Sequence, residues 1–414
     1  MTPASNAPDS ALKPPKDDRA GWLLLGAILL AATPVALCFS IASPILPKMA
    51  ADLGRRASDA YLVKMVQGVM GFAMVLGAAL AGVLADRLGR RWLLIGAGLV
   101  FAVAGAAPFL LTSLPLILLA RFVAGAAAVS TGVAGAALLA DRFEGADRTR
   151  WMGLFEAVAM GGGLIALFAA GMMGDLGWRW PFLLCLIGAP MAALALATPG
   201  RRPATSGVEP ADAPGARRAK LPWGLALFAF LIGFITYSPS IYLPFRLAHL
   251  GVVNPSAVGM CLMSSVVVST IASSLFGRVR RVLSTASVFG LSFAAVAVGV
   301  GTTAVAPDLT VALVGLGFLG LGVGWMAPNL TAASAGAADG AHRGRSIGLV
   351  RAAHSLAPII GVAAMEPVSK SLGVEAVLLL SAAVAAVMAA AVLLTRGAFK
   401  APLQPSLETP EPQT

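Results

Sequence analysis

Long apolar runs separated by short clusters of charged and polar residues make up most of this chain. Most runs are about 20 residues long, the length that an α-helix needs to cross a hydrocarbon core about 30 Å thick. They predict twelve membrane-spanning helices, at residues 22–46, 60–84, 92–111, 115–140, 151–173, 180–198, 222–246, 257–276, 284–306, 309–335, 345–366 and 373–395. We therefore expect an all-α membrane protein with no separate soluble domain.

A linker at residues 199–221, rich in proline, alanine, glycine and arginine, divides the runs into two groups of six. This composition is typical of a flexible connection between domains. We predict an N-terminal six-helix bundle at 21–198 and a C-terminal six-helix bundle at 222–396. Cytoplasmic tails are expected at 1–20 and 397–414.

The two groups of runs align with each other when the sequence is shifted by about 195 residues. Gly82 then falls on Gly277, and Arg150 falls on Arg345. Matches that keep their order along the chain indicate an internal duplication, so the two bundles should be pseudo-symmetric.

Composition and charge indicate that this chain is embedded in a lipid bilayer. Hydrophobic residues make up 58% of it and charged residues 12%, too few for the surface of a soluble protein. The net charge of +11 does not indicate nucleic acid, because the basic residues follow the positive-inside rule instead of forming one patch. The expected outer side holds only Lys48, Arg55, Arg56, Lys64, Arg179, Arg246 and Lys370. We expect both termini in the cytoplasm and a multi-pass protein of a bacterial inner membrane.

Residues for enzymatic chemistry are too scattered to form a catalytic or metal site. The three histidines and three cysteines match no spacing of metal ligands or nucleophiles. A phosphate-binding loop of the G-x-x-x-x-G-K-S/T type is also absent, so pumping driven by ATP is unsupported. We expect no enzyme activity, no cofactor and no metal.

The stretch GVLADRLGRR, between the second and third apolar runs, is the densest charged motif of the chain. Its spelling resembles the signature loop between helices 2 and 3 of the major facilitator superfamily, a class of twelve-helix secondary transporters. The resemblance implies alternating access and a cytoplasmic gate, with the acid interacting across the two halves. The gate residues would be Asp86, Arg87, Gly89, Arg90 and Arg91. As an alternative, the arginines serve only as anchors on the inner side.

Arg121 lies within an apolar run and begins the string R-F-V-A-G. An arginine inside a membrane costs several kcal/mol unless it is paired or hydrated, so it is a functional candidate by default. The string resembles the R-x-x-x-G motif of the same superfamily, which implies a role in proton coupling. The alternative is that its side chain reaches the outer surface.

Glu156 and Arg351 occupy equivalent positions of the two repeats, three residues after the matched pair Gly153 and Gly348. They are a candidate charge pair, with proton coupling expected at Glu156 and substrate binding at Arg351, or a purely structural salt bridge. His354 shares a helical face with Arg351 and is a candidate proton carrier. Its ring could instead bond a backbone carbonyl.

Four further residues, Tyr237, Tyr242, Trp325 and Asn329, are candidates for substrate binding. They are polar or amphipathic groups on helices that line the cavity in the superfamily, although helix packing explains them equally well. The string GLGFLG at Gly315–Gly320 matches a dinucleotide fingerprint in spelling only, because no strand precedes it. We expect close helix packing there.

The end of the first run, SPILPKMAADLG, and the turn GWRWPF at Gly177–Phe182 resemble the drug and metabolite proton antiporters of the superfamily. Two departures are the missing proline in the fifth run, within Met160–Gly171, and the missing acid in the first. We expect a proton-coupled exporter of small organic compounds, with protons, the substrate and the lipid bilayer as partners of a monomer. The alternative is a transporter or facilitator for organic anions with an Arg- and His-lined cavity.

Overall fold

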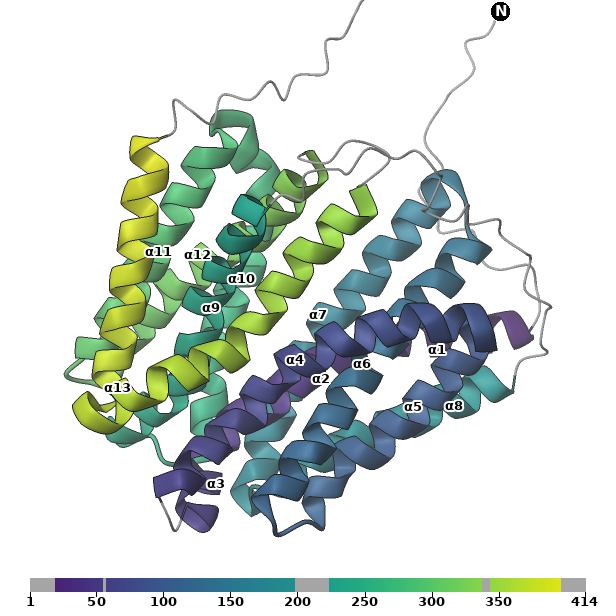
Figure 1. The fold of residues 1–414 in the computed structure, drawn as a ribbon, viewed down its shortest axis with the longest axis horizontal. Helices are drawn as coiled ribbons and strands as arrows, with labels where there is room; N and C mark the ends of the chain where they lie inside the picture. Colours follow the sequence, from purple (N-terminus) through teal and green to yellow (C-terminus); the bar gives the residue numbers. More distant parts are fainter. Residues whose placement is uncertain (1–18, 55–56, 198–222, 337–342, 396–414) are drawn as a thin grey trace, which may run out of the picture. The chain divides into compact units, whose positions relative to one another are not determined.

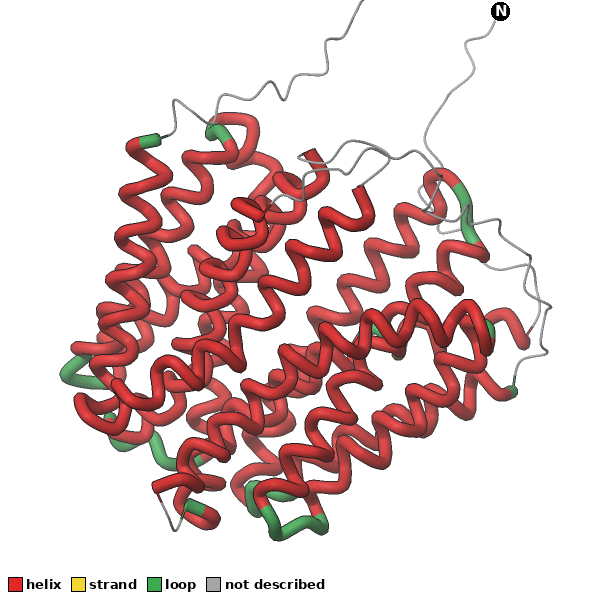
Figure 2. Tube along the Cα trace, in the orientation of Figure 1, coloured by secondary structure: helices red, strands yellow, loops and turns green. Residues whose placement is uncertain are grey.

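The computed structural model describes residues 19–54, 57–197, 223–336 and 343–395. Within these ranges every regular element is helical (Figure 2). The chain is thus an all-α membrane protein, as the apolar runs predicted. The expected linker and C-terminal tail, and nearly all of the expected N-terminal tail, lie outside the described residues.

The helices follow the predicted apolar runs closely. They are α1 (Arg19–Leu30), α2 (Thr33–Ala42), α3 (Leu46–Leu53), α4 (Ala57–Leu88), α5 (Arg90–Ala106), α6 (Leu114–Arg142), α7 (Gly145–Leu176), α8 (Gly188–Leu196), α9 (Trp223–His249), α10 (Pro255–Val282), α11 (Thr285–Val305), α12 (Leu309–Gly336) and α13 (Arg343–Leu394). Three short 3-10 helices, η1 (Ser43–Ile45), η2 (Ala107–Phe109) and η3 (Trp180–Ile187), extend or join them.

Ten of the described helical segments are long and apolar enough to cross a membrane. One of them, Gly348–Leu394, is 47 residues long and breaks at Gly373, where φ is 87° and ψ is 174°. The break divides α13 into the two arms visible in Figure 1, and glycine adopts this φ without the steric cost of a Cβ atom. Trp180–Leu196 is a shorter apolar helix. The count of twelve crossings stays a prediction.

The chain forms two compact units. The first contains α1–α8 and the segment Val253–Gly259, and the second contains α9, the rest of α10 and α11–α13. The first turn of α10 belongs to the first unit because its backbone is bound there: Ser256 N donates to Asp175 Oδ1 at 3.1 Å. A methyl group at Gly171 would also lie 3.0 Å from Pro255 O, so the backbones are in close contact.

In the second unit, α12 is held between α10 and α11 by glycines. A Cβ atom at Gly315 would lie 2.9 Å from Thr303 N of α11, and one at Gly320 would lie 3.0 Å from Ser265 C of α10. Only residues without side chains allow helix backbones to approach this closely. Close packing is therefore confirmed for Gly315 and Gly320 of the GLGFLG string, whereas a Cβ atom at Gly317 would meet no heavy atom within 4 Å.

Candidate functional site

A candidate site is a cavity of about 570 Å³ within the second unit. Helices α9, α10, α12 and α13 form its walls. The lining residues are Ile232, Thr236, Tyr237, Ser240, Ser265, Val266, Ser269, Leu319, Val323, Met326, Ala327, Leu330, Thr331, Val350, Arg351 and His354. A mostly apolar wall with a few polar groups is the usual chemistry of a site for small organic molecules.

The lining residues recur at the spacing of one helix face. On α9 they are Ile232, Thr236 and Ser240, each four residues apart, and the same interval joins Ser265 to Ser269 on α10. Thr236 Oγ1 donates to Ile232 O, and Ser240 Oγ donates to Thr236 O at 2.7 Å. These hydroxyl donors are satisfied within their own helix, so each oxygen retains lone pairs that can accept a bond from a ligand.

Arg351 and His354 bring positive charge and a titratable ring to the cavity. The Arg351 side chain is exposed, and no ion pair joins it to a described carboxylate. His354 Nδ1 lies 3.2 Å from Ala229 O, and its ring centroid lies 5.3 Å from that of Tyr237. A carbonyl oxygen only accepts, so Nδ1 carries the proton of this bond and Nε2 is the acceptor of the neutral ring. The backbone bond expected as the alternative for His354 is thus present, and its role as a proton carrier stays a prediction.

The cavity lining contains Tyr237, Arg351 and His354 but not the other three predicted binding residues. Tyr242 is buried, with its hydroxyl 3.5 Å from Glu366 Oε2. Asn329 is also buried, and its Nδ2 donates to Thr285 O at 3.0 Å. Trp325 Nε1 is buried without a hydrogen-bond partner among the described residues. These contacts fit helix packing, and substrate binding by the three residues stays a prediction.

Glu156 is exposed on α7, in the first unit, and forms no ion pair with any described residue. Arg351 belongs to the second unit. The charge pair between Glu156 and Arg351 therefore stays a prediction.

Arg121 is completely buried within the first unit. Its Nη2 donates to Cys38 O, its Nε donates to Val66 O at 3.4 Å, and its guanidinium carbon lies 5.7 Å from the centroid of the Phe182 ring. Nη1 has no partner, and no described carboxylate pairs with this charge. Burial excludes the alternative in which the side chain reaches the outer surface.

The predicted gate motif forms the connection between α4 and α5. Gly89 has a φ of 85°, a value that favours glycine, and lies between the two helices. Arg90 Nη1 pairs with Asp141 and donates to Ala137 O at 3.3 Å, both on α6. Arg91 donates to Ala195 O at 2.9 Å and to Leu196 O at 3.1 Å, both on α8. Arg90 and Arg91 therefore bind the connection to helices of its own unit.

The remaining charges of the motif, Asp86 and Arg87, are exposed. Neither makes a hydrogen bond or ion pair with a described residue. This division of the motif, with two fastened charges and two exposed ones, could not be read from its spelling. The gate role itself stays a prediction.

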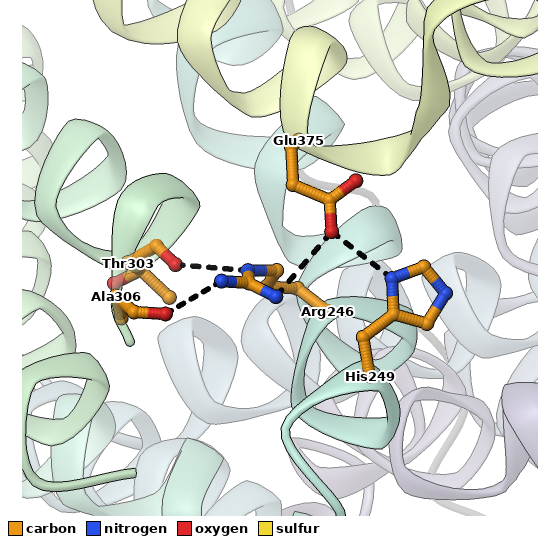
Figure 3. Close-up of polar contacts among 5 residues, drawn as sticks. All are labelled: Arg246, His249, Thr303, Ala306 and Glu375. Carbon is orange, nitrogen blue, oxygen red and sulfur yellow. Dashed lines mark hydrogen bonds and ion pairs between the residues drawn. The ribbon is translucent and has the colours of Figure 1, made fainter. Parts of the chain in front are cut away.

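An ion-pair cluster at the end of α9 was not predicted from the sequence (Figure 3). Arg246 Nη1 lies 3.3 Å from Glu375 Oε1, and His249 Nδ1 lies 3.0 Å from the same oxygen. Arg246 also donates to Thr303 O at 3.3 Å and to Ala306 O at 2.7 Å, at the end of α11. The cluster joins α9, α11 and the second arm of α13, and its only signal in the sequence is the pair of basic residues on one face of α9.

Comparison with known proteins identifies the family. The sequence profile of the Major Facilitator Superfamily matches residues 28–285 and 225–413. The class C tetracycline resistance protein of Escherichia coli is 30% identical over 177 residues, which are 42% of this chain and 42% of that protein. The MFS-type efflux transporter pyiT of Pyricularia grisea is 25% identical over 173 residues, 39% of this chain and 29% of that protein. Each alignment thus spans less than half of the relative's length.

The fold agrees with the sequence match. The crystal structure of the nucleoside transporter NupG superimposes with a TM-score of 0.74, at 15% identity, over 90% of this chain and 99% of that one. This identity is low enough that the likeness describes the fold alone. A profile that covers almost all of the sequence nevertheless assigns the family, whose members are transporters and not enzymes. The chain belongs to the Major Facilitator Superfamily.

Proposed function

We propose that this chain is a secondary active transporter that exports a small organic compound in exchange for protons by alternating access. The observation that carries the proposal is the cavity of the second unit, whose volume of about 570 Å³ suits a small organic molecule. Efflux-type relatives support the direction of transport. The proposed location is a bacterial inner membrane with both termini in the cytoplasm, because basic residues follow the positive-inside rule.

Proton coupling is assigned to Arg121, Glu156 and His354. A guanidinium without a carboxylate partner raises the local cost of any further positive charge, so it favours release of a proton from a nearby group. His354 supplies a ring that titrates near neutral pH in water, at the wall of the cavity. Substrate contacts are assigned first to Tyr237 and Arg351, which line the same cavity, and further to Tyr242, Trp325 and Asn329.

The gate is assigned to the connection between α4 and α5. Arg90 and Arg91 hold it to α6 and α8, which leaves Asp86 and Arg87 exposed for contacts that form in only one state of the transport cycle. We expect Asp86→Asn to slow transport while the protein folds and inserts normally, because the substitution removes an exposed charge. Transport at the wild-type rate would contradict the gate role.

The decisive experiment is transport by the purified chain in proteoliposomes with an imposed pH gradient. A panel of cationic dyes and organic anions is offered with the gradient present, with the gradient collapsed by an ionophore, and to empty liposomes. Uphill movement that needs the gradient would support proton exchange. Equilibration at the same rate with and without the gradient would identify a facilitator.

A transporter for organic anions is the second candidate, and one observation favours it. The only charged side chain that lines the cavity among the described residues is Arg351, and no carboxylate lines it. A charge-assisted hydrogen bond contributes about 1.5–3 kcal/mol, so Arg351→Gln should weaken binding of an anion by roughly one to two orders of magnitude. Unchanged affinity for anions in this variant would exclude the second candidate.

A further inference from the structure

A second hollow lies in the first unit, where α4 and α5 both pack on α6. It has a volume of about 310 Å³, and its lining is almost entirely apolar. The lining residues are Gly77, Leu80, Leu84, Leu88, Trp92, Leu93, Gly96, Ala97, Val100, Phe122, Val123, Ala126, Ala127 and Ser130. We call it the α4–α5 groove.

The groove is open and presents large apolar side chains. Leu80 is 57% exposed, Leu88 is 56% exposed and Trp92 is 58% exposed. A Cβ atom at Gly96 would meet no heavy atom within 4 Å, so the missing side chain leaves space. The single polar residue, Ser130, donates to Ala126 O of its own helix at 2.8 Å and offers no free hydroxyl proton. Such a surface needs an apolar ligand.

One end of the groove carries positive charge. Leu88 and Trp92 lie beside the connection between α4 and α5, next to Arg87 and Arg91 in the sequence. The guanidinium carbon of Arg91 lies 5.8 Å from the centroid of the Trp92 ring, and Arg87 is exposed without an ion pair to a described residue. Asp86 is exposed on the same turn, whereas Arg90 is paired with Asp141.

The polarity of the groove therefore matches one ligand, which is apolar along its length and negative at one end. From Leu80 to Leu88 the groove follows two turns of α4, about 12 Å at 1.5 Å per residue, enough for much of an acyl chain. We propose that the α4–α5 groove binds an anionic phospholipid, with one acyl chain along Leu80, Leu84 and Gly96 and the phosphate at Arg87. This site is separate from the cavity of the second unit and goes beyond the proposed transport.

The test uses the full chain, purified in detergent, with lipid binding measured by native mass spectrometry. The probes are phosphatidylglycerol, phosphatidylcholine with the same acyl chains, and inorganic phosphate. We expect at least one phosphatidylglycerol to bind more tightly than phosphatidylcholine, and inorganic phosphate not to displace it. Equal affinity for both lipids, or displacement by inorganic phosphate, would overturn the proposal.

Substitutions locate the binding site. Gly96→Leu fills the groove with a residue that favours helix, so binding of phosphatidylglycerol should fall by about tenfold or more. Gly317→Leu is the matched control, because a Cβ atom there also meets no heavy atom within 4 Å and Gly317 lies outside the groove. Thermal unfolding of both variants confirms their folding. Loss of lipid in the control alone, or in neither variant, would overturn the proposal.

The headgroup contact is tested by Arg87→Gln. Without this charge, phosphatidylglycerol should lose about tenfold in affinity and phosphatidylcholine less, because the choline cation already offsets the charge of the phosphate in phosphatidylcholine. The same mass spectra report the oligomeric state. Dimers that vanish in Gly96→Leu, with lipid content unchanged, would show that a second copy of the chain occupies the groove.

Discussion

Arg121 and Arg246 are both arginines with little exposure whose guanidinium groups bond backbone carbonyls, but only one of them is neutralised. Arg246 has a side chain that is 11% exposed, and it pairs with Glu375 while bonding two carbonyls at the end of α11. Arg121 is completely buried, and no described carboxylate pairs with it. The two arginines therefore need different explanations.

Arg246 is explained by structure alone. A charge that is paired and hydrogen-bonded can be retained for the contacts that it makes between helices. Arg121 makes only two backbone bonds and leaves one buried nitrogen without a partner. A residue kept at such a cost within a membrane is expected to act in the transport cycle.

The largest expected effect is on transport by Arg121 variants. Arg121→Ala should reduce uphill transport in proteoliposomes to the level of empty liposomes, because the buried charge is lost. Arg121→Lys should restore part of it, since lysine keeps the charge but cannot bond both Cys38 O and Val66 O with a planar group. Full uphill transport by the alanine variant would show that Arg121, like Arg246, has only a structural role.

The next largest effect is on stability. Arg246→Ala removes bonds to α11 and leaves Glu375 without its guanidinium partner, at a cost of about 2–3 kcal/mol. Thermal unfolding of the purified variant should show a lower melting temperature. Transport by the protein that remains folded should still depend on the pH gradient. Loss of that dependence in a stable variant would mean that Arg246 also takes part in coupling.

Glu375→Gln makes Arg246 resemble Arg121 by removing only the negative charge. The amide oxygen still accepts a bond from Arg246, and Glu375 is 37% exposed, so water screens part of the change. We expect a cost of about 1 kcal/mol in thermal unfolding and no change in transport. A cost as large as that of Arg246→Ala would show that the ion pair, and not the backbone bonds, stabilises this end of the unit.

His249→Ala should have the smallest effect. The His249 side chain is 53% exposed, and exposed pairs contribute about 0.2–1 kcal/mol. The difference in thermal unfolding from wild type should shrink as salt is raised, because salt screens an exposed ion pair. An equal loss at low and at high salt would indicate packing instead of charge.

Much of the fold could be predicted from the sequence because hydropathy is a local property. The predicted run at 60–84 corresponds to the span Asp59–Leu88, and the predicted run at 222–246 corresponds to the span Trp223–His249. Arg121 was recognised for the same reason, as a charge inside an apolar run. Arg246 and Glu375 could not be paired, because 129 residues separate them and no local pattern reports that contact.

The cavity lining was predicted less well than the fold. Four lining residues were missed: Thr236, Ser240, Ser265 and Ser269. The hydroxyls of Thr236 and Ser240 bond their own helix, and a small polar residue of this kind does not stand out in an apolar segment. Asn329 is the opposite case. It is conspicuous in the sequence, but helical spacing does not say which neighbouring helix it faces, and its amide bonds α11.

In helix α12, different residues pack against the neighbouring helices and line the cavity. Gly315 and Gly320 hold it against α11 and α10, whereas Leu319, Val323 and Leu330 line the cavity. Mutations at the lining positions can alter which molecules fit without touching the glycines that keep the helices together. Single substitutions at the lining positions of this helix can therefore change which molecules fit while the bundle stays folded. At Gly315 and Gly320, almost any substitution should disrupt the packing of the helices.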